Sequence, residues 1–179
     1  CSIERGDQVI IPSGNDAIMN GDVISYIASA DQSNEFVKQL GVDYKPIRSC
    51  MIVGGGRVTY YIAKYMHDSH MKCKLKVIDH DRDRCEFLAG EFPDATIING
   101  DGTDQDLLIR EGIEKTDAFC SLTGFDEENI MLSLYAGKLS NARLITKINR
   151  IAFENVTSEM NLGSVIYPKQ IVADHIVQY

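Results

Sequence analysis

Three consecutive glycines, Gly54–Gly56, separate a short apolar run from a segment with helical periodicity in the stretch SCMIVGGGRVTYYIAK. A buried strand, a glycine turn and a helix in this order are typical of the first unit of a parallel sheet. Short apolar runs and helical patterns continue to alternate downstream, which predicts right-handed crossovers and an α/β fold, a doubly wound parallel sheet with helices on both faces. The predicted strands are Cys50–Val53, Leu75–Asp79, Thr96–Asn99, Ala118–Leu122, Arg143–Ile148 and Val165–Tyr167, and the predicted helices lie near 57–68, 82–91, 103–111, 126–140 and 151–161.

The residues before this alternation have a different pattern. Two short apolar strands are predicted, Gln8–Ile11 and Val23–Ala28, joined by the turn-rich segment PSGNDAIMNGD. Two strands cannot build a core, so we interpret this part as the β-rich tail of a domain that begins upstream. Cys1 in place of an initiator Met favours the same interpretation, a piece of a longer polypeptide.

Helical segments flank the predicted sheet. SNEFVKQLG predicts a short helix, capped by Ser33 or Asn34 and ended by Gly41, with Pro46 in the linker that follows. A last helix is predicted at Lys169–Gln178. The predicted organisation is therefore a tail with a linker helix at 1–45, a sheet domain at 46–167 and a final helix at 168–179.

Composition excludes several functions. The formal net charge is −8 and the sequence pI is about 4.9, which opposes binding to nucleic acid or to anionic lipid. The cysteines number five, an odd count, and none lies in a C-x-x-C pair. This pattern argues against a disulfide framework and a zinc site, and favours reduced thiols in a cytosolic protein.

The glycine turn matches a dinucleotide fingerprint in context. Gly54 suits a tight turn out of the strand, and Gly56 would let a phosphate approach the backbone and the N-terminus of the next helix. Asp79 ends the second strand, where a carboxylate would accept hydrogen bonds from ribose hydroxyls and repel a ribose phosphate. This favours NAD or an adenine nucleotide over NADP. Thr59 occupies the third glycine position, and its bulk makes the match imperfect.

Polar residues follow the other strands, where the ligand crevice of a doubly wound sheet lies. Thr103 and Asp126 are also predicted to cap helices, and Arg150 fits a solvated ion pair as well as a functional role. The polar residues at the strand ends are Asp101, Thr103, Thr123, Gly124 and Lys147, with Arg150 just beyond.

The run VIDHDRDRCEFLAGEFPDATIINGDGTDQDLLIREGIEKTDAFCSLTGFDEEN, together with IVGGGRV before it and INR after it, resembles the TrkA family. These are cytosolic regulatory subunits of Trk-type potassium uptake systems, and the resembling part, residues 46–179, is their Rossmann-like nucleotide-binding lobe, called RCK or KTN. The opening strands resemble the end of the smaller lobe of a preceding RCK unit.

The resemblance implies a site for NAD(H) or for ATP or ADP, with no metal and no catalytic residue. It places Arg57 near nucleotide phosphates at a dimer interface, and makes the last helix a crossover helix that packs on a partner. It implies a homo-dimer or higher assembly, cytoplasmic and peripheral to the inner face of the membrane, on a membrane-embedded potassium transporter subunit. The implied site residues are Gly54, Gly55, Gly56, Arg57, Val58, Asp79, His80, Asp101, Gly102, Thr123, Gly124 and Lys147.

Two enzyme classes share parts of this pattern. An NAD-dependent oxidoreductase is the alternative to a nucleotide-gated regulatory module. Tyr60 and Lys64 fit the Tyr-x-x-x-Lys spacing of such enzymes. These two residues lie in the helix after the glycine turn, however, where they cannot face a nicotinamide. A methyltransferase using S-adenosylmethionine shares the glycine turn and the acid, and ranks last. The sequence therefore favours a sensor of nucleotides.

Overall fold

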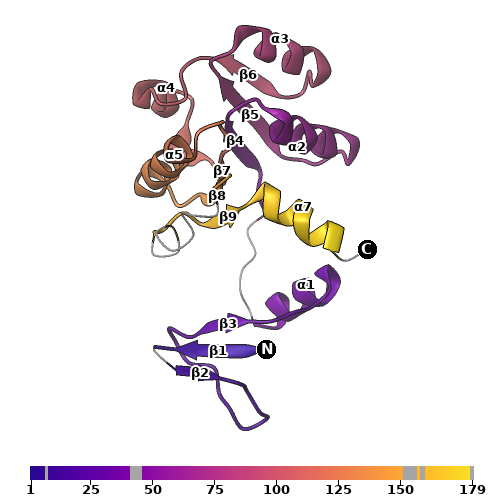
Figure 1. Cartoon of the computed structure of the whole chain (residues 1–179), viewed down its shortest axis with the longest axis vertical. Helices are drawn as coiled ribbons and strands as arrows, with labels where there is room; N and C mark the ends of the chain where they lie inside the picture. Colours follow the sequence, from indigo (N-terminus) through magenta and orange to yellow (C-terminus); the bar gives the residue numbers. More distant parts are fainter. Residues whose placement is uncertain (7, 41–45, 151–156, 158–159, 178–179) are drawn as a thin grey trace. The chain divides into compact units, whose positions relative to one another are not determined.

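A computed structural model of the chain describes residues 1–6, 8–40, 46–150, 157 and 160–177 (Figure 1). The chain divides into two compact units, Cys1–Pro46 and Ile47–Tyr179, which are described separately below. No helix among the described residues is long and apolar enough to cross a membrane.

The first unit is a small antiparallel sheet followed by a helix. Its strands are β1 (Ser2–Arg5), β2 (Gln8–Ile10) and β3 (Val23–Ser25), in the order β2-β1-β3. The central strand β1 was not predicted, because only Ile3 of its residues is buried and the segment has no apolar run. Arg5 joins β1 to the β2–β3 connection through an ion pair with Asp22 at 2.7 Å.

Helix α1 (Ala30–Gln39) begins earlier than predicted. Its N-cap is Ser29, whose hydroxyl accepts from the amide of Gln32 while the Gln32 side chain accepts from the amide of Ser29. The prediction of Ser33 or Asn34 as the cap is wrong, because this reciprocal pair fixes the first turn four residues earlier. The predicted stop at Gly41 lies outside the described residues.

The second unit is the predicted doubly wound sheet. All of its strand pairs are parallel, in the order β6-β5-β4-β7-β8-β9, so the order reverses between β4 and β7. The strands are β4 (Ser49–Val53), β5 (Lys74–Asp79), β6 (Thr96–Asn99), β7 (Ala118–Ser121), β8 (Arg143–Lys147) and β9 (Ser164–Ile166). The predicted α/β fold is confirmed.

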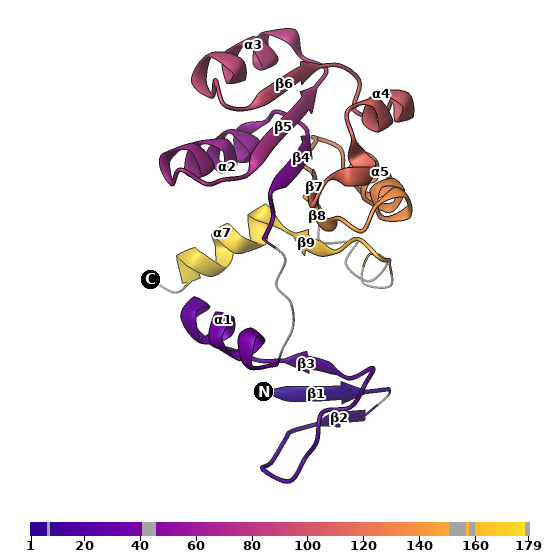
Figure 2. The same cartoon turned by 180° about the vertical axis from the view of Figure 1, so that it is seen from behind.

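Helices cover both faces of this sheet (Figures 1 and 2). Helices α2 and α3 pack on one face through Ala63, Leu88 and Phe92, and α4 and α5 pack on the other through Leu108 and Leu132. The bounds are α2 (Arg57–Asp68), α3 (Arg82–Glu91), α4 (Gln105–Arg110), a short 3₁₀ turn (Ile113–Lys115), α5 (Asp126–Leu139) and α7 (Pro168–Val177). The helix predicted at 151–161 falls mostly outside the described residues.

Two predicted helix caps are wrong. Asp104 rather than Thr103 caps α4, because its carboxylate accepts from the amides of Asp106 and Leu107. The cap of α5 is Phe125, and Asp126 is the first helical residue, with its side chain used elsewhere. Several polar residues near the start of each helix could serve as its N-cap, and the contacts in the folded chain decide which one does.

The cysteines are free thiols, as expected for a chain without a disulfide framework. Cys50 and Cys120 lie on neighbouring strands with sulfurs 3.8 Å apart, and Cys85 is also buried. The neighbouring thiol of Cys120 and burial raise the pKa of Cys50, so it is held as a neutral apolar group.

A buried row of hydroxyls joins β7, α5 and β8. The Ser133 hydroxyl lies 2.7 Å from those of Ser121 and Thr146, and Thr146 also donates to the carbonyl of Leu162 at 2.8 Å. The three hydroxyl residues are fully buried, so Ser121 and Ser133 depend on this row for their hydroxyl hydrogen bonds, while Thr146 also has the carbonyl of Leu162. Ser133 is the shared member of this row.

Replacing Ser133 with Ala is expected to destabilise the protein by about 1–3 kcal/mol, because Ser121 loses its hydroxyl partner in a dry environment. Urea unfolding measures this difference. Lys138→Ala on the exposed side of the same helix is the control, and should change stability by less than about 0.5 kcal/mol. Equal effects of the two substitutions would contradict the assigned role.

Candidate functional site

A cleft of about 570 Å³ opens at the carboxyl ends of β4 and β7, where the strand order reverses. This is the position at which doubly wound sheets bind ligands. Most of the residues predicted for the site line it: Gly54, Gly56, Asp79, His80, Asp101, Gly102, Thr123, Gly124 and Lys147. The other three, Gly55, Arg57 and Val58, lie in the turn and at the start of α2 but are not among the lining residues.

The glycine turn leaves β4 in a conformation that requires glycine. Gly54 has φ +103°, and a Cβ there would lie 2.7 Å from the carbonyl carbon of Leu122. Thr59, predicted to be an imperfect fit, is fully buried and its hydroxyl donates to the carbonyl of Gly54. The hydroxyl therefore closes the turn at the position where the fingerprint has a third glycine.

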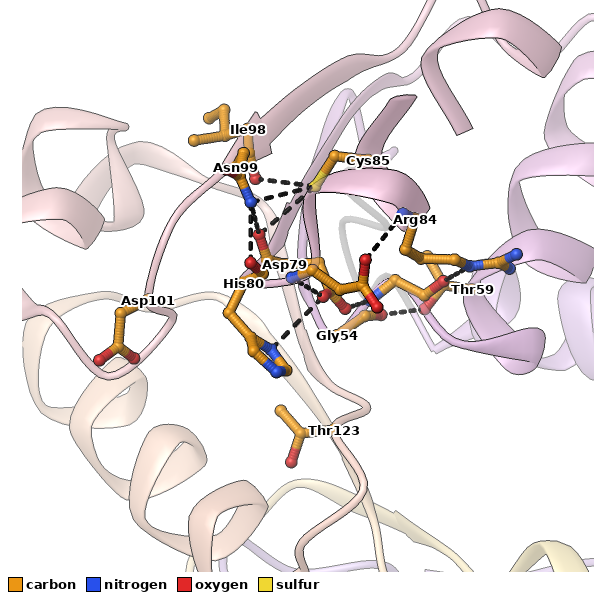
Figure 3. Close-up of polar contacts among 12 residues, drawn as sticks. Gly54, Thr59, Asp79, His80, Arg84, Cys85, Ile98, Asn99, Asp101 and Thr123 are labelled. Atoms are coloured by element: carbon orange, nitrogen blue, oxygen red, sulfur yellow. Dashed lines mark hydrogen bonds and ion pairs between the residues drawn. The ribbon is translucent and has the colours of Figure 1, made fainter. Parts of the chain in front are cut away.

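The carboxylate of Asp79 connects β5 to this turn (Figure 3). Oδ2 accepts from the amide of Gly55 at 2.5 Å, and Oδ1 accepts from the amide of Asp81 at 2.8 Å. The side chain is 12% exposed, and each carboxylate oxygen has capacity for a further bond. Asp79 can therefore hold the turn and still accept a sugar hydroxyl from the cleft.

His80 and Asp101 form the rim beside Asp79. The His80 imidazole is 86% exposed, with Nδ1 3.5 Å from Asp79 Oδ1. Asp101 accepts from the hydroxyl and the amide of Thr103, and these bonds lower the pKa of its carboxyl. Next to it, a Cβ on Gly102 would lie 2.2 Å from a methyl of Val53, so glycine allows the loop after β6 to approach the end of β4.

Two residues that sequence reasoning missed hold this side of the site. Arg84 Nε donates to the carbonyl of Gly55, and its Nη2 donates to that of Gly56 at 3.2 Å. Asn99 donates through Nδ2 to the carbonyls of Asp79 and His80, at 3.1 and 2.9 Å. Asn99 could have been noticed as the last residue of the neighbouring strand, whereas no pattern points from Arg84 to a turn 29 residues earlier.

On the opposite side, the buried amide of Asn129 organises the cleft. Its Oδ1 accepts from the amide of Thr123 at 2.8 Å, and its Nδ2 donates to the carbonyls of Thr123 and Lys147, at 3.3 and 2.9 Å. Asn129 is fully buried in α5. One side chain therefore fixes the loop after β7 and the end of β8 together.

Lys147 supplies a cation to this wall. Its Nζ donates to the carbonyl of Leu122 at 3.1 Å. Burial lowers the pKa of Lys147, and the carboxylate of Asp126 partly opposes that shift. The ammonium group is placed where it can also meet a ligand anion in the cleft.

Asp126 holds the segment that follows β8. Its carboxylate accepts from the backbone and side-chain nitrogens of Asn149 and from the amide and Nε of Arg150. Burial would raise the pKa of Asp126, but these hydrogen bonds outweigh it and the net shift is downward. Arg150 also pairs with Glu127, so its role here is an ion pair rather than a cleft contact.

No described residues form a group of three or more His, Cys, Asp or Glu side chains that could hold a metal ion. The two residues of the Tyr-x-x-x-Lys spacing also lie apart from the cleft. Tyr60 packs against Phe92, and Lys64 pairs with Asp68 at 3.2 Å. The site is therefore built from backbone amides, carboxylates and one ammonium group.

Comparison with known proteins identifies the family of the chain. The family model of the TrkA-N domain matches residues 50–168, which contain the whole cleft. The chain belongs to the TrkA-N family. TrkA of Haemophilus influenzae, a Trk system potassium uptake protein, is 35% identical over 170 residues, covering 95% of this chain and 36% of its own length. TrkA of Halomonas elongata is 30% identical over 169 residues, which cover 94% of this chain and 36% of that protein.

The chain thus spans little more than a third of the length of these TrkA relatives. Among solved structures, the TrkA-N domain of the Escherichia coli inner membrane protein ybaL superposes with a TM-score of 0.65 at 15% identity, covering 75% of this chain and 97% of that one. A GsuK channel bound to NAD superposes with a TM-score of 0.56 at 15% identity, and the match covers 75% of this chain and 25% of the channel chain. Both show the same doubly wound fold as this chain.

Asp126 predicts a pH dependence of stability. Its pKa is lowered on folding, so its contribution is present above the ordinary aspartate pKa of about 4 and is lost as pH falls through the lowered value. Asp126→Asn should therefore be less stable than wild type at pH 7, with a smaller difference at pH 3. Urea unfolding at both pH values measures the change, and a difference that is equal at the two would contradict this account.

Proposed function

We propose that this TrkA-N chain is part of a cytosolic regulatory subunit of a potassium uptake transporter, and that its cleft binds NAD(H) or an adenine nucleotide, ATP or ADP. The TrkA relatives are Trk system potassium uptake proteins, and the fold neighbour GsuK is a channel bound to NAD. The observation that carries the proposal is the Asp79 carboxylate beside the N-terminus of α2, at the point where the strand order reverses.

The cleft offers separate groups for each part of a nucleotide. Asp79 would accept from the ribose hydroxyls, and His80 and the Asp101–Gly102 loop would border the base. The phosphates would meet the first amides of α2, whose N-cap Gly56 provides no side-chain cap. Arg57 is the first residue of that helix and would add a positive charge there.

The far wall would hold the remainder of the ligand. Thr123, Gly124 and Lys147 line it, and Lys147 would face a second phosphate or the nicotinamide ribose. The ligand would then contact both halves of the sheet. A regulatory protein needs a ligand with different affinities for two states, and a coupling of about 1–3 kcal/mol is sufficient.

The proposed protein catalyses no reaction and acts through assembly. It pairs as a homo-dimer or a higher assembly, peripheral to the inner face of the membrane, where it contacts the transporter subunit. The oxidoreductase alternative gains no support from Tyr60 and Lys64, which pack or pair away from the cleft. Binding without turnover is the function that the cleft suits best.

The proposal predicts a micromolar dissociation constant for NADH, ADP or ATP by isothermal titration calorimetry. Arg57→Ala should lower the affinity for these phosphate-bearing ligands by about tenfold, because a positive charge beside the phosphates is lost. Arg110→Ala removes the same charge from an exposed position in α4, outside the cleft, and should change affinity by less than about twofold. Wild-type protein that binds none of the three nucleotides would overturn the proposed function.

Asp79 predicts the choice between NADH and NADPH. Wild-type protein should bind NADPH at least about tenfold more weakly than NADH, because the carboxylate repels a ribose phosphate. Asp79→Asn keeps an oxygen for the amide of Gly55 but removes the charge. It should therefore lower the affinity for NADH and bring the dissociation constants of NADPH and NADH closer together. Parallel titrations of the two cofactors measure the ratio, and an unchanged ratio would contradict the ribose contact.

A further inference from the structure

We propose that Arg84 is a positioning residue that orients the backbone amides of Gly56 and Arg57 toward the phosphates of the bound nucleotide. This inference rests on the proposed function and adds a residue that lies on α3, outside the residues lining the cleft. It is carried by the hydrogen bonds of the glycine turn, taken one peptide group at a time.

The peptide group between Gly54 and Gly55 is held at both ends. Its carbonyl accepts from the hydroxyl of Thr59, and its N–H donates to Asp79. This group therefore has its N–H committed within the protein. The amide of Gly55 is not a free donor for a phosphate.

Within the described part of the chain, the next two peptide groups are hydrogen-bonded at their carbonyls alone. Arg84 donates to the carbonyl of Gly55 through Nε and to that of Gly56 through Nη2. The Gly56 carbonyl also accepts the first helical bond, from the amide of Tyr60 at 3.1 Å. In a trans peptide the C=O and N–H bonds point in opposite directions. Fixing these two carbonyls on Arg84 therefore directs the N–H groups of Gly56 and Arg57 away from the guanidinium.

The turn is open to the cleft at Gly56. Gly56 lines the cleft, and a Cβ built on it would meet no atom within 4 Å. Space for a ligand group therefore exists next to Gly56, where the two directed amides begin the helix. The anion subsite of this turn is thus a pair of amides, rather than the whole glycine run.

Arg84 is itself fixed in place. Its guanidinium carbon lies 4.9 Å from the ring centroid of Phe87 and 6.0 Å from that of Tyr60. Its own backbone amide donates to the N-cap carboxylate of Asp81 at 3.0 Å. Stacking on aromatic rings and the planar fork of the guanidinium hold both donors in one orientation. The turn is therefore set before any ligand arrives.

The test compares ligands with and without phosphate. In Arg84→Met, the affinities for ADP and NADH should fall by about tenfold or more, while the affinity for adenosine, measured by displacement of bound NADH or by direct titration, should change by less than about twofold. Arg84→Lys should give an intermediate loss, because an ammonium group does not reproduce the two-pronged contact. Equal losses for ADP and adenosine, or no loss for either, would overturn the inference.

Arg82→Met is the matched control. It removes the same charge from the same helix, at a side chain that is 79% exposed and pairs with Glu86 at 2.9 Å. It should leave ADP, NADH and adenosine binding within about twofold of wild type. A loss of ADP affinity equal to that of Arg84→Met would assign the effect to charge rather than to positioning, and would overturn the inference.

A second measurement needs no ligand and separates this inference from the proposed function. Backbone ¹⁵N order parameters of Gly56 and Arg57 should be near 0.85 in wild type and in Arg82→Met, and below about 0.6 in Arg84→Met. Unchanged order parameters would overturn the inference even where wild-type protein binds nucleotide. Wild-type protein that binds no nucleotide, with the order parameters as expected, would overturn the proposed function and with it the phosphate role of Arg84, and would leave Arg84 only as the residue that orders the turn.

Discussion

The bond from the amide of Gly55 to the carboxylate of Asp79 joins the two strands on which the cleft depends. Strands β4 and β5 are parallel neighbours with Val53 opposite Ile78, so the turn after one and the acid ending the other meet at the same edge. Thr59 closes the turn from its own helix. Because the carboxylate is already ordered by backbone donors, its orientation toward a sugar does not have to be established by the ligand.

The other half of the cleft reaches the same rigidity with different chemistry. Asn129 fixes the backbone of Thr123 and Lys147, and Asp126 fixes the backbone of Asn149 and Arg150. Both side chains come from the first turn of α5 and are buried. A buried amide or carboxylate left without partners is costly, so these contacts favour one arrangement of the loops after β7 and β8.

The sequence predicted the sheet better than the supports of its cleft. The strands of the second unit are short apolar runs buried on both faces, and this signal is local. Strand β1 was missed because Ile3 alone carries it, and the cap at Ser29 was missed because the reciprocal bond with Gln32 competes with other polar residues nearby. Arg84 and Asn129 depend on distances that only the folded chain sets. The assignment of residues 1–45 to the smaller lobe of a preceding RCK unit stays a prediction.

The charges around the cleft bear on whether it binds or reacts. Asp79, Asp101 and Glu128 line it against Lys147 and His80, so its net charge does not by itself attract a phosphate, and the amides at the start of α2 with Arg57 have to supply that attraction. The bonds from Thr103 lower the pKa of Asp101, and burial lowers that of Lys147 while its Nζ donates to a backbone carbonyl. The hydrogen bonds commit both groups to holding the loops around the cleft. They are well suited to fix the shape of the cleft, as the proposed nucleotide sensor would require.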